Sequence, residues 1–378
     1  MKITKVPGFG DYGILVENFD YNDPDQYLKL KEVSLKNLVT IVDGGDQDRF
    51  DSLNQHLSLV TNARPYTARW AAMYGWDWET KVTADEIEVV DLVQKWIVDK
   101  NYLGWTKVSG QTDDYGKPMG VFGETELLWH NDDGANINFH PLINLYTAQH
   151  ANTSATCFLQ TATWYEQQSE SFKSELNELV CKYTWDNSKI QPGSDKLNEI
   201  IVRSNHVPPN YVDIPLVVTT PGGITGIYFN PMVTGFAGMG DAESDLLLKT
   251  ITDGIYKPEY QYDHWYRNSM GDLVILDQCI TLHSRKIDSS KNLKEELTQR
   301  VLYRCPSDYT GLENFNPFGN TTSNVARAER IKFRDYGSTR QYLTQLKTGS
   351  AAEKKEFLDK YVPKSDHKRF FELIQRLQ

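Results

Sequence analysis

The sequence predicts a β-rich α+β fold of the sandwich, jelly-roll or barrel type, with helices around it. Segments rich in β-branched and aromatic residues are short, they are bounded by Pro and Gly, and few helical patterns separate them. The composition, with 39% hydrophobic and 24% charged residues, is that of an ordinary globular chain. The expected strands are Leu142–Thr147, Ala155–Leu159, Leu216–Thr220, Ile224–Phe229, Asp272–Leu282 and Arg300–Arg304.

The N-terminal segment has the pattern of a β-α-β-α unit. An apolar run at Gly13–Phe19 is followed by a helical pattern at Asp23–Lys36 and a second apolar run, Leu38–Val42. A Gly-Gly pair ends that run in a turn, and Asp46–Val60 has the spacing of an amphipathic helix.

Further helices are expected within and after the strand series. Tyr165–Lys182 and Asp241–Asp253 have helical patterns and are predicted to be insertions. From Val325 onward the chain becomes charged and helical in pattern, with helices expected at Lys354–Tyr361 and His367–Leu377. We therefore predict one main domain over residues 1–324 and a helical C-terminal appendix over residues 325–378.

The charge balance argues against nucleic acid as a partner. Forty Lys and Arg residues against fifty-one Asp and Glu residues give a net charge of −11, whereas neutralising many phosphates needs a cationic surface. A local basic pocket is still compatible with this balance.

The cysteines and apolar segments predict a cytoplasmic protein without a membrane partner. Cys157, Cys181, Cys279 and Cys305 form no C-x-x-C pair and are too sparse for a disulfide scaffold, which favours a reducing compartment. The N-terminus has no apolar signal region, and no segment approaches the roughly 20 apolar residues of a membrane span. A homo-oligomer is compatible with the sequence.

A His-x-Asp pair and a distant histidine form a candidate metal site. Because side chains alternate along a strand, His130 and Asp132 are expected to point the same way and share one ion. With His283 they would present two imidazoles and a carboxylate, the facial triad of non-haem Fe(II) oxygenases. Taken alone the pair is weak evidence, since His130 could be satisfied at a strand end and His283 could lie at the surface. His264 is expected at the surface, and Asp277 in a structural role.

Around these ligands the sequence resembles the taurine dioxygenase-like (TauD/TfdA-type) Fe(II)/2-oxoglutarate-dependent oxygenases, over most of residues 10–305. The resemblance implies a double-stranded β-helix, a jelly-roll or cupin-like core with flanking helices, and makes residues 1–324 the catalytic domain. It implies Fe(II) bound by His130, Asp132 and His283, with 2-oxoglutarate and O2 as co-substrates. The matching segments are Gly13–Phe19, Asn37–Val42, Glu126–Asp132, Gly226–Asn230, Gly271–Gln278 and Gln299–Arg304.

The resemblance also implies residues that bind oxoglutarate. Thr156 fits the hydroxyl that follows the Asp ligand, with twenty-three residues between it and Asp132. Arg300 fits the arginine that pairs with the far carboxylate, because a guanidinium fork matches a carboxylate in two hydrogen bonds. Sixteen residues separate it from His283, more than is usual, and a polar insertion at Asp288–Glu296 accounts for the excess.

Two alternatives to this assignment stay open. Lys291 and Lys294 are nearer the usual spacing from the distal histidine, but a lysine offers no fork. Arg304, four residues after Arg300, should leave the same strand face. In relatives acting on sulfonates or carboxylates the corresponding arginine meets the substrate's anionic end. Here it could instead pair with an acid, or anchor oxoglutarate if Arg300 faces away.

The resemblance places Glu126 and the stretch Tyr228–Phe236, which contains Asn230, in the substrate pocket. Glu126 would suit a cationic or hydroxyl-bearing substrate and Arg304 an anionic one. A zwitterion such as an amino acid would satisfy both.

The activity implied is hydroxylation of a C–H bond in a small, polar or charged molecule, with release of succinate and CO2. Asp132 argues against halogenation, because halogenating relatives carry a small residue there. Three alternatives are kept: a catalytically inactive jelly-roll binding or sensor protein, a nucleic-acid dealkylase with the same iron centre, which the net charge disfavours, and an iron oxygenase that uses no oxoglutarate.

Overall fold

The computed structural model describes residues 1–44, 61–63, 106–112, 126–132, 141–149, 154–184, 189, 211–265, 271–288, 300–309 and 345–377. The chain divides into two compact units, one formed by Met1–Arg64 with Trp105–Lys332 and the other by Pro65–Gly104 with Phe333–Gln378. The helix predicted over 46–60 lies outside the described residues.

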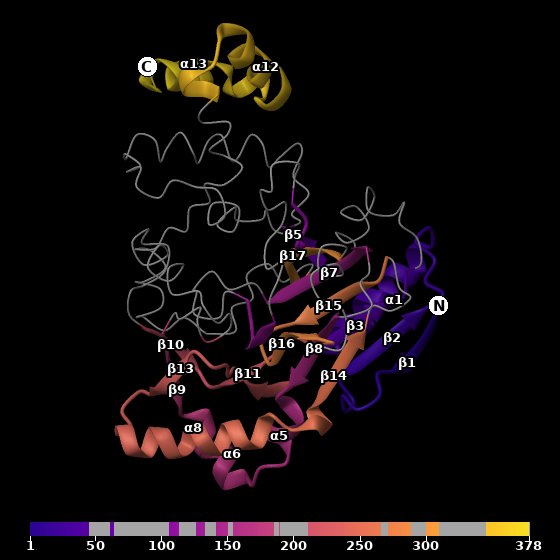
Figure 1. The fold of residues 1–378 in the computed structure, drawn as a ribbon, viewed down its shortest axis with the longest axis vertical. Coiled ribbons are helices and arrows are strands. Elements are labelled where there is room, and N and C mark those ends of the chain that lie inside the picture. The colour runs from indigo at the N-terminus through magenta and orange to yellow at the C-terminus, as the bar shows by residue number, and fades with distance from the viewer. Residues whose placement is uncertain are drawn as a thin grey trace. The chain divides into compact units, whose positions relative to one another are not determined.

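An eight-stranded sheet forms one wall of the larger unit (Figure 1). Its order is β1-β2-β3-β15-β7-β17-β4, with β5 also pairing with β17. The β2–β3 pair is parallel, as the predicted strand-helix-strand pattern requires, because α1 makes the crossover between them. The bounds are β1 Lys2–Lys5, β2 Gly13–Glu17, α1 Pro24–Leu35, β3 Val39–Val42, β4 Thr61–Ala63, β5 Thr106–Val108, β7 Leu142–Gln149, β15 Leu273–Asp277 and β17 Val301–Tyr309.

A four-stranded antiparallel sheet, in the order β14-β8-β16-β6, forms the second wall. Side chains from both sheets line one cavity, so the sheets face each other as in a jelly roll. The strands are β6 Leu127–His130, β8 Ser154–Gln160, β14 Gln261–Trp265 and β16 Thr281–Ile287.

The strands at the centre of the larger sheet are buried on both faces. Every residue of β15 and β3 is buried, which explains their continuous apolar runs. On one face, Tyr27 and Leu30 of α1 pack with Val16 and Val42 in a hydrophobic cluster. This packing fixes β15, and with it the chain that leads into β16.

Small sheets and helices cover the remainder of this unit. The helix predicted at Tyr165–Lys182 is wrong as a single element: the chain forms α5, α6 and then strand β9. Ser169 begins a new helix by accepting a hydrogen bond from Phe172 N, and Val180–Thr184 pairs with two strands distant in sequence. The elements are α5 Ala162–Glu166, α6 Glu170–Asn177, β9 Val180–Thr184, β10 Tyr211–Pro215, β11 Val217–Thr219, β12 Thr225–Ile227, β13 Val233–Phe236, α8 Asp241–Ile255 and η3 Pro258–Tyr260.

The described part of the second unit is helical, with α12 at Ala351–Tyr361, η4 at Lys364–Asp366 and α13 at His367–Leu377. These elements include both helices expected there. Phe357, Tyr361 and Phe370 lie in its own buried core. Among the described residues, no helix combines the length and the apolar character that crossing a membrane requires.

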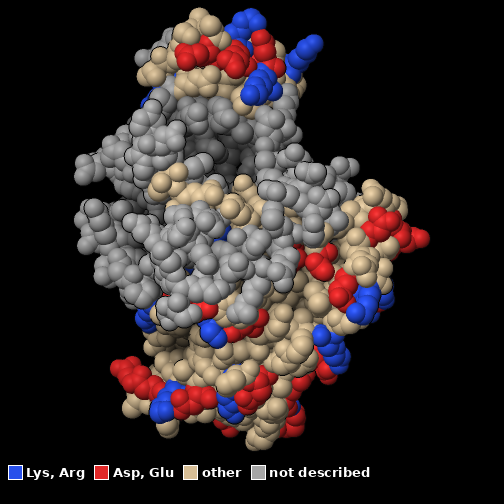
Figure 2. Space-filling model, turned by 45° about the vertical axis from the view of Figure 1, so that its right-hand side comes forward, with Lys and Arg blue, Asp and Glu red and all other residues tan. Residues whose placement is uncertain are grey.

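Charges of both signs are mixed over the described part of the face shown in Figure 2. Lys249 pairs with Asp253 within α8, and Lys2 pairs with Glu17 across β1 and β2. The described part of this face therefore carries no broad basic surface of the kind that binds a nucleic-acid backbone.

Candidate metal centre

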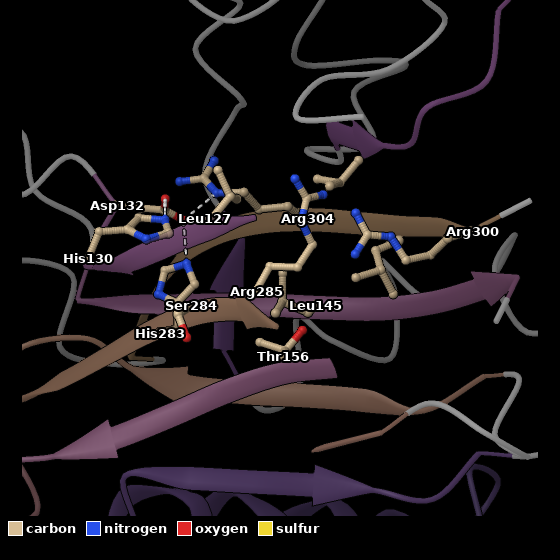
Figure 3. A pocket seen from close by; sticks show the side chains of 12 residues that line it. Leu127, His130, Asp132, Leu145, Thr156, His283, Ser284, Arg285, Arg300 and Arg304 are labelled. Carbon is tan, nitrogen blue, oxygen red and sulfur yellow. Dashed lines mark hydrogen bonds and ion pairs between the residues drawn. The ribbon is translucent and has the colours of Figure 1, made fainter. Parts of the chain in front are cut away.

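Two histidines and an aspartate converge where β6 pairs with β16 (Figure 3). His130 lies directly opposite His283 in the strand pairing, and their ring centroids are 4.3 Å apart. The Asp132 carboxylate lies between them: its Oδ1 is 3.7 Å from His130 Nε2 and its Oδ2 is 3.7 Å from His283 Nε2. All three side chains are buried, and their ligand atoms lie within 4.8 Å of one another.

Asp132 reaches this position from a turn, because β6 ends at His130. Gln278, buried after the end of β15, holds that turn. Its Oε1 accepts a hydrogen bond from Asp132 N at 2.8 Å, and its carbonyl accepts one from Asn131 Nδ2 at 3.4 Å. The two ligands thus share a side as the alternation argument predicts. They do so through a turn that is held by Gln278, in the segment between β15 and β16.

The protonation states of the three groups suit a divalent cation. The His130 Nδ1 donates to the Leu128 carbonyl at 2.7 Å, which leaves the Nε2 lone pair facing Asp132. Burial lowers the pKa of His130, and lowers the pKa of His283 to about 3, so both imidazoles are neutral near pH 7. Burial acts to raise the pKa of Asp132, but the charge and hydrogen bond of the Arg304 guanidinium outweigh it and hold that pKa well below its usual range.

These residues fit Fe(II) as a resident metal. Two neutral imidazole nitrogens and one ionised carboxylate are the donor set of the facial triad, and they are deprotonated as metal ligands must be.

The two arginines considered for the site lie toward different ends of it. Arg304 of β17 donates from Nε to Asp132 Oδ2 at 2.6 Å. Arg300, just before β17, donates from Nη1 to Ser154 Oγ at 3.2 Å, at the start of β8. Both guanidinium groups are buried and line the same cavity as the histidines, so neither faces away from the site.

That cavity is lined from both sheets. Thr156 of β8 lies on its wall, as the oxoglutarate assignment requires. A third arginine, Arg285 of β16, also lines it and was missed by the sequence analysis (Figure 3). Its position two residues after His283, on the same face of a strand, was the signal that could have identified it.

The family is decided by sequence comparison. The sequence model of the family described as "Taurine catabolism dioxygenase TauD, TfdA family" matches residues 97–305, more than half of the chain. The chain belongs to the TauD/TfdA family. This chain is therefore an Fe(II)/2-oxoglutarate dioxygenase with an H-x-D…H facial triad. No curated protein matches the sequence.

Solved structures that resemble this TauD/TfdA chain confirm the predicted double-stranded β-helix. A structure of AAD-2 in complex with Mn(II) and N-oxalylglycine has a TM-score of 0.55 and 18% identity, covering 84% of this chain and 99% of that one. A taurine dioxygenase from Burkholderia xenovorans has a TM-score of 0.52 and 15% identity, and the match covers 81% of this chain and 89% of that one. An α-ketoglutarate-dependent taurine dioxygenase homologue from the same organism has a TM-score of 0.53 and 14% identity, and the match covers 81% of this chain and 90% of that one.

The remaining residues considered for the TauD/TfdA site lie outside the cavity lining that the structure describes. Glu126 is exposed just before β6. Asn230 is buried; its Nδ2 donates to Asn131 Oδ1, and its Oδ1 accepts from Met232 N at 2.8 Å. Asn230 thus supports the residue between the two ligands of the His-x-Asp pair. Contact of Glu126 or Asn230 with substrate stays a prediction.

One expectation about a histidine is wrong. His264 is buried on β14, with Nε2 3.1 Å from Asp272 Oδ2, instead of lying at the surface. The partner is eight residues away along the chain, and the sequence pattern did not reveal the contact. Asp277 is buried and accepts hydrogen bonds from Tyr309 and Cys279, as its expected structural role implies.

Proposed function

We propose that this enzyme hydroxylates a C–H bond of a small polar or charged molecule, using one 2-oxoglutarate and one O2 and releasing succinate and CO2. One oxygen atom enters the alcohol and the other enters succinate. The observation that carries the proposal is the convergence of His130, His283 and Asp132 at the end of a cavity lined by buried arginines.

The residues of the triad would hold Fe(II) through His130 Nε2, His283 Nε2 and the Asp132 carboxylate. The metal, when bound, supplies the chemistry that couples loss of CO2 from oxoglutarate to oxidation of the substrate. Burial of all three ligands excludes bulk water from them, which favours the coupled reaction over side reactions.

The cavity wall would bind the co-substrate. Arg300 offers a fork of N–H donors for the distal carboxylate, and the Thr156 hydroxyl offers a further donor. Arg304 holds Asp132 and could also contact an anionic substrate from the same wall. Glu126 and Asn230 are proposed as substrate contacts on the resemblance alone.

The test is succinate formation by the protein supplied with Fe(II), 2-oxoglutarate and O2, in a screen of amines, amino acids and sulfonates. We expect oxoglutarate-dependent succinate and CO2 in equal amounts, stimulated by one class of substrate. Asp132→Ala should abolish both products, while Lys286→Ala, an exposed change on the outer face of β16, should retain them. A protein that binds metal through the intact triad but forms no succinate would favour the binding or sensor alternative.

A further inference from the structure

The cavity has two chemically distinct ends. His130, His283 and Asp132 form one end, and Arg304 is committed to it by its hydrogen bond to Asp132. Arg300 defines the other, because its Nη1 donates to Ser154 Oγ at the start of β8. Neither end is exposed, since all of these residues are buried.

Arg285 lies between these two ends of the cavity. On β16 it lies directly opposite Thr156 of β8 in the strand pairing. Thr156 is two residues after Ser154, so both point from the same face of β8, and both are buried. Arg285 rises from the smaller sheet, whereas Arg300 lies just before β17 of the larger sheet. Figure 3 shows the side chain of Arg285 extending between those of Arg304 and Arg300.

We propose that Arg285 binds the distal carboxylate of 2-oxoglutarate together with Arg300 and Thr156, so that guanidinium groups from both sheets hold one carboxylate. This inference rests on the proposed function. It adds a residue that the resemblance did not indicate, on a different strand from Arg300.

The donor count supports this arrangement. An ionised carboxylate has about four lone-pair sites, so a fork from one arginine leaves room for a second arginine and a hydroxyl. The charge count supports it as well: the described residues of the cavity wall carry three guanidinium groups but a single carboxylate, Asp132. This excess of guanidinium groups over carboxylates suits a ligand with a negative charge at each end, such as the dicarboxylate 2-oxoglutarate.

The test compares two ligands that differ only in the distal carboxylate. Equilibrium affinities of the Mn(II)-loaded protein for 2-oxoglutarate and for 2-oxopentanoate are measured by calorimetry, so that no turnover is needed. For Arg285→Leu we expect a loss of about 10- to 100-fold in affinity for 2-oxoglutarate, as for a lost charge-assisted hydrogen bond. The affinity for 2-oxopentanoate should stay at the wild-type value, and Arg300→Leu should show the same selectivity.

Lys286→Leu is the matched control, because it removes a cation from the next position of β16 on the exposed face. It should leave both affinities unchanged. If Arg285→Leu does not fold, Arg285→Gln gives the same comparison with a polar side chain. Unchanged binding of 2-oxoglutarate, or an equal loss for both ligands, would overturn the role of Arg285 alone. A wild-type protein that binds neither ligand would overturn the proposed function as well.

Discussion

The Arg304 guanidinium and the Asp132 carboxylate join the two sheets at the metal centre, with Nε donating to Oδ2 at 2.6 Å. The carboxylate reaches the site from the end of β6 in the smaller sheet, and the arginine from β17 in the larger one. The orientation of one metal ligand therefore depends on how the sheets pack. The same pair fixes the position of Arg304, so a substrate contact of this arginine would use its terminal N–H groups while Nε stays on Asp132.

Arg304→Leu should weaken binding of a divalent metal by about 10- to 100-fold, the usual cost of losing a partner that orients a ligand. Isothermal titration with Mn(II) measures the metal affinity. Arg304→Lys keeps the charge without the fork, so its affinity should fall between those of wild type and Arg304→Leu. Tighter binding in Arg304→Leu would contradict the prediction, because it would mean that repulsion between the guanidinium and the cation exceeds the benefit of orienting Asp132.

Gln278→Met should also weaken metal binding, by about tenfold or more, although Gln278 touches no metal. The substitution removes the acceptor of Asp132 N and leaves a buried N–H without its partner, which costs about 1–3 kcal/mol of folding free energy. Metal titration and thermal melting of the same sample separate the two effects. An unchanged metal affinity with a lower melting temperature would show that the turn keeps its shape without Gln278.

Asp277 predicts a specific pH dependence of stability. Burial raises the pKa of this carboxyl to about 6, against partial opposition from hydrogen bonds donated by Tyr309 and Cys279. Since the folded pKa is above the unfolded one, the folded state binds the extra proton, and this contribution is lost as pH rises from about 4 through 6. The loss amounts to about 3 kcal/mol.

Asp277→Asn should remove that contribution. The difference in unfolding free energy between wild type and variant, from urea titrations at several pH values, should therefore shift in favour of the variant as pH rises from about 4 to 7. The buried histidines, whose lowered pKa values act in the opposite direction, are present in both proteins and cancel. A difference that is independent of pH would contradict the assignment.

The cap of α12 gives a prediction for the C-terminal helices. Ser350 Oγ accepts from Glu353 N at 3.3 Å, while the Glu353 carboxylate accepts from Ser350 N at 2.7 Å. Ser350→Ala should destabilise the helix by about 1 kcal/mol, seen as faster hydrogen exchange of the amides in the first turns of α12. Ser365→Ala, an exposed serine outside the capping box, should leave that exchange unchanged.

The metal ligands could be predicted from sequence because the short segments around them resemble those of the TauD/TfdA family. His130 and Asp132 are two residues apart, and His283 follows a recognisable buried strand. The turn that carries Asp132 could not be predicted, since Gln278 lies 146 positions away along the chain. The strand at Val180–Thr184 was taken as helix for a related reason, because its pairing partners are distant in sequence.

The roles of the arginines also depend on contacts between residues that are distant in sequence. The sequence identified Arg300 and Arg304 as a pair but not which end of the cavity each would reach, because their partners Ser154 and Asp132 lie on other strands. Arg285 alternates with His283 on β16, yet its position beside Thr156 depends on the register between β16 and β8. Such register becomes visible only in the folded chain.

The central claim is that His130, Asp132 and His283 bind one metal ion together. Its most direct test is anaerobic equilibrium dialysis of wild type, His283→Ala and Asp132→Ala against Fe(II). One equivalent bound by wild type, with a large loss of affinity in both variants while their folds are retained, is the predicted result. Equal binding by all three proteins, or no binding by wild type, would contradict it.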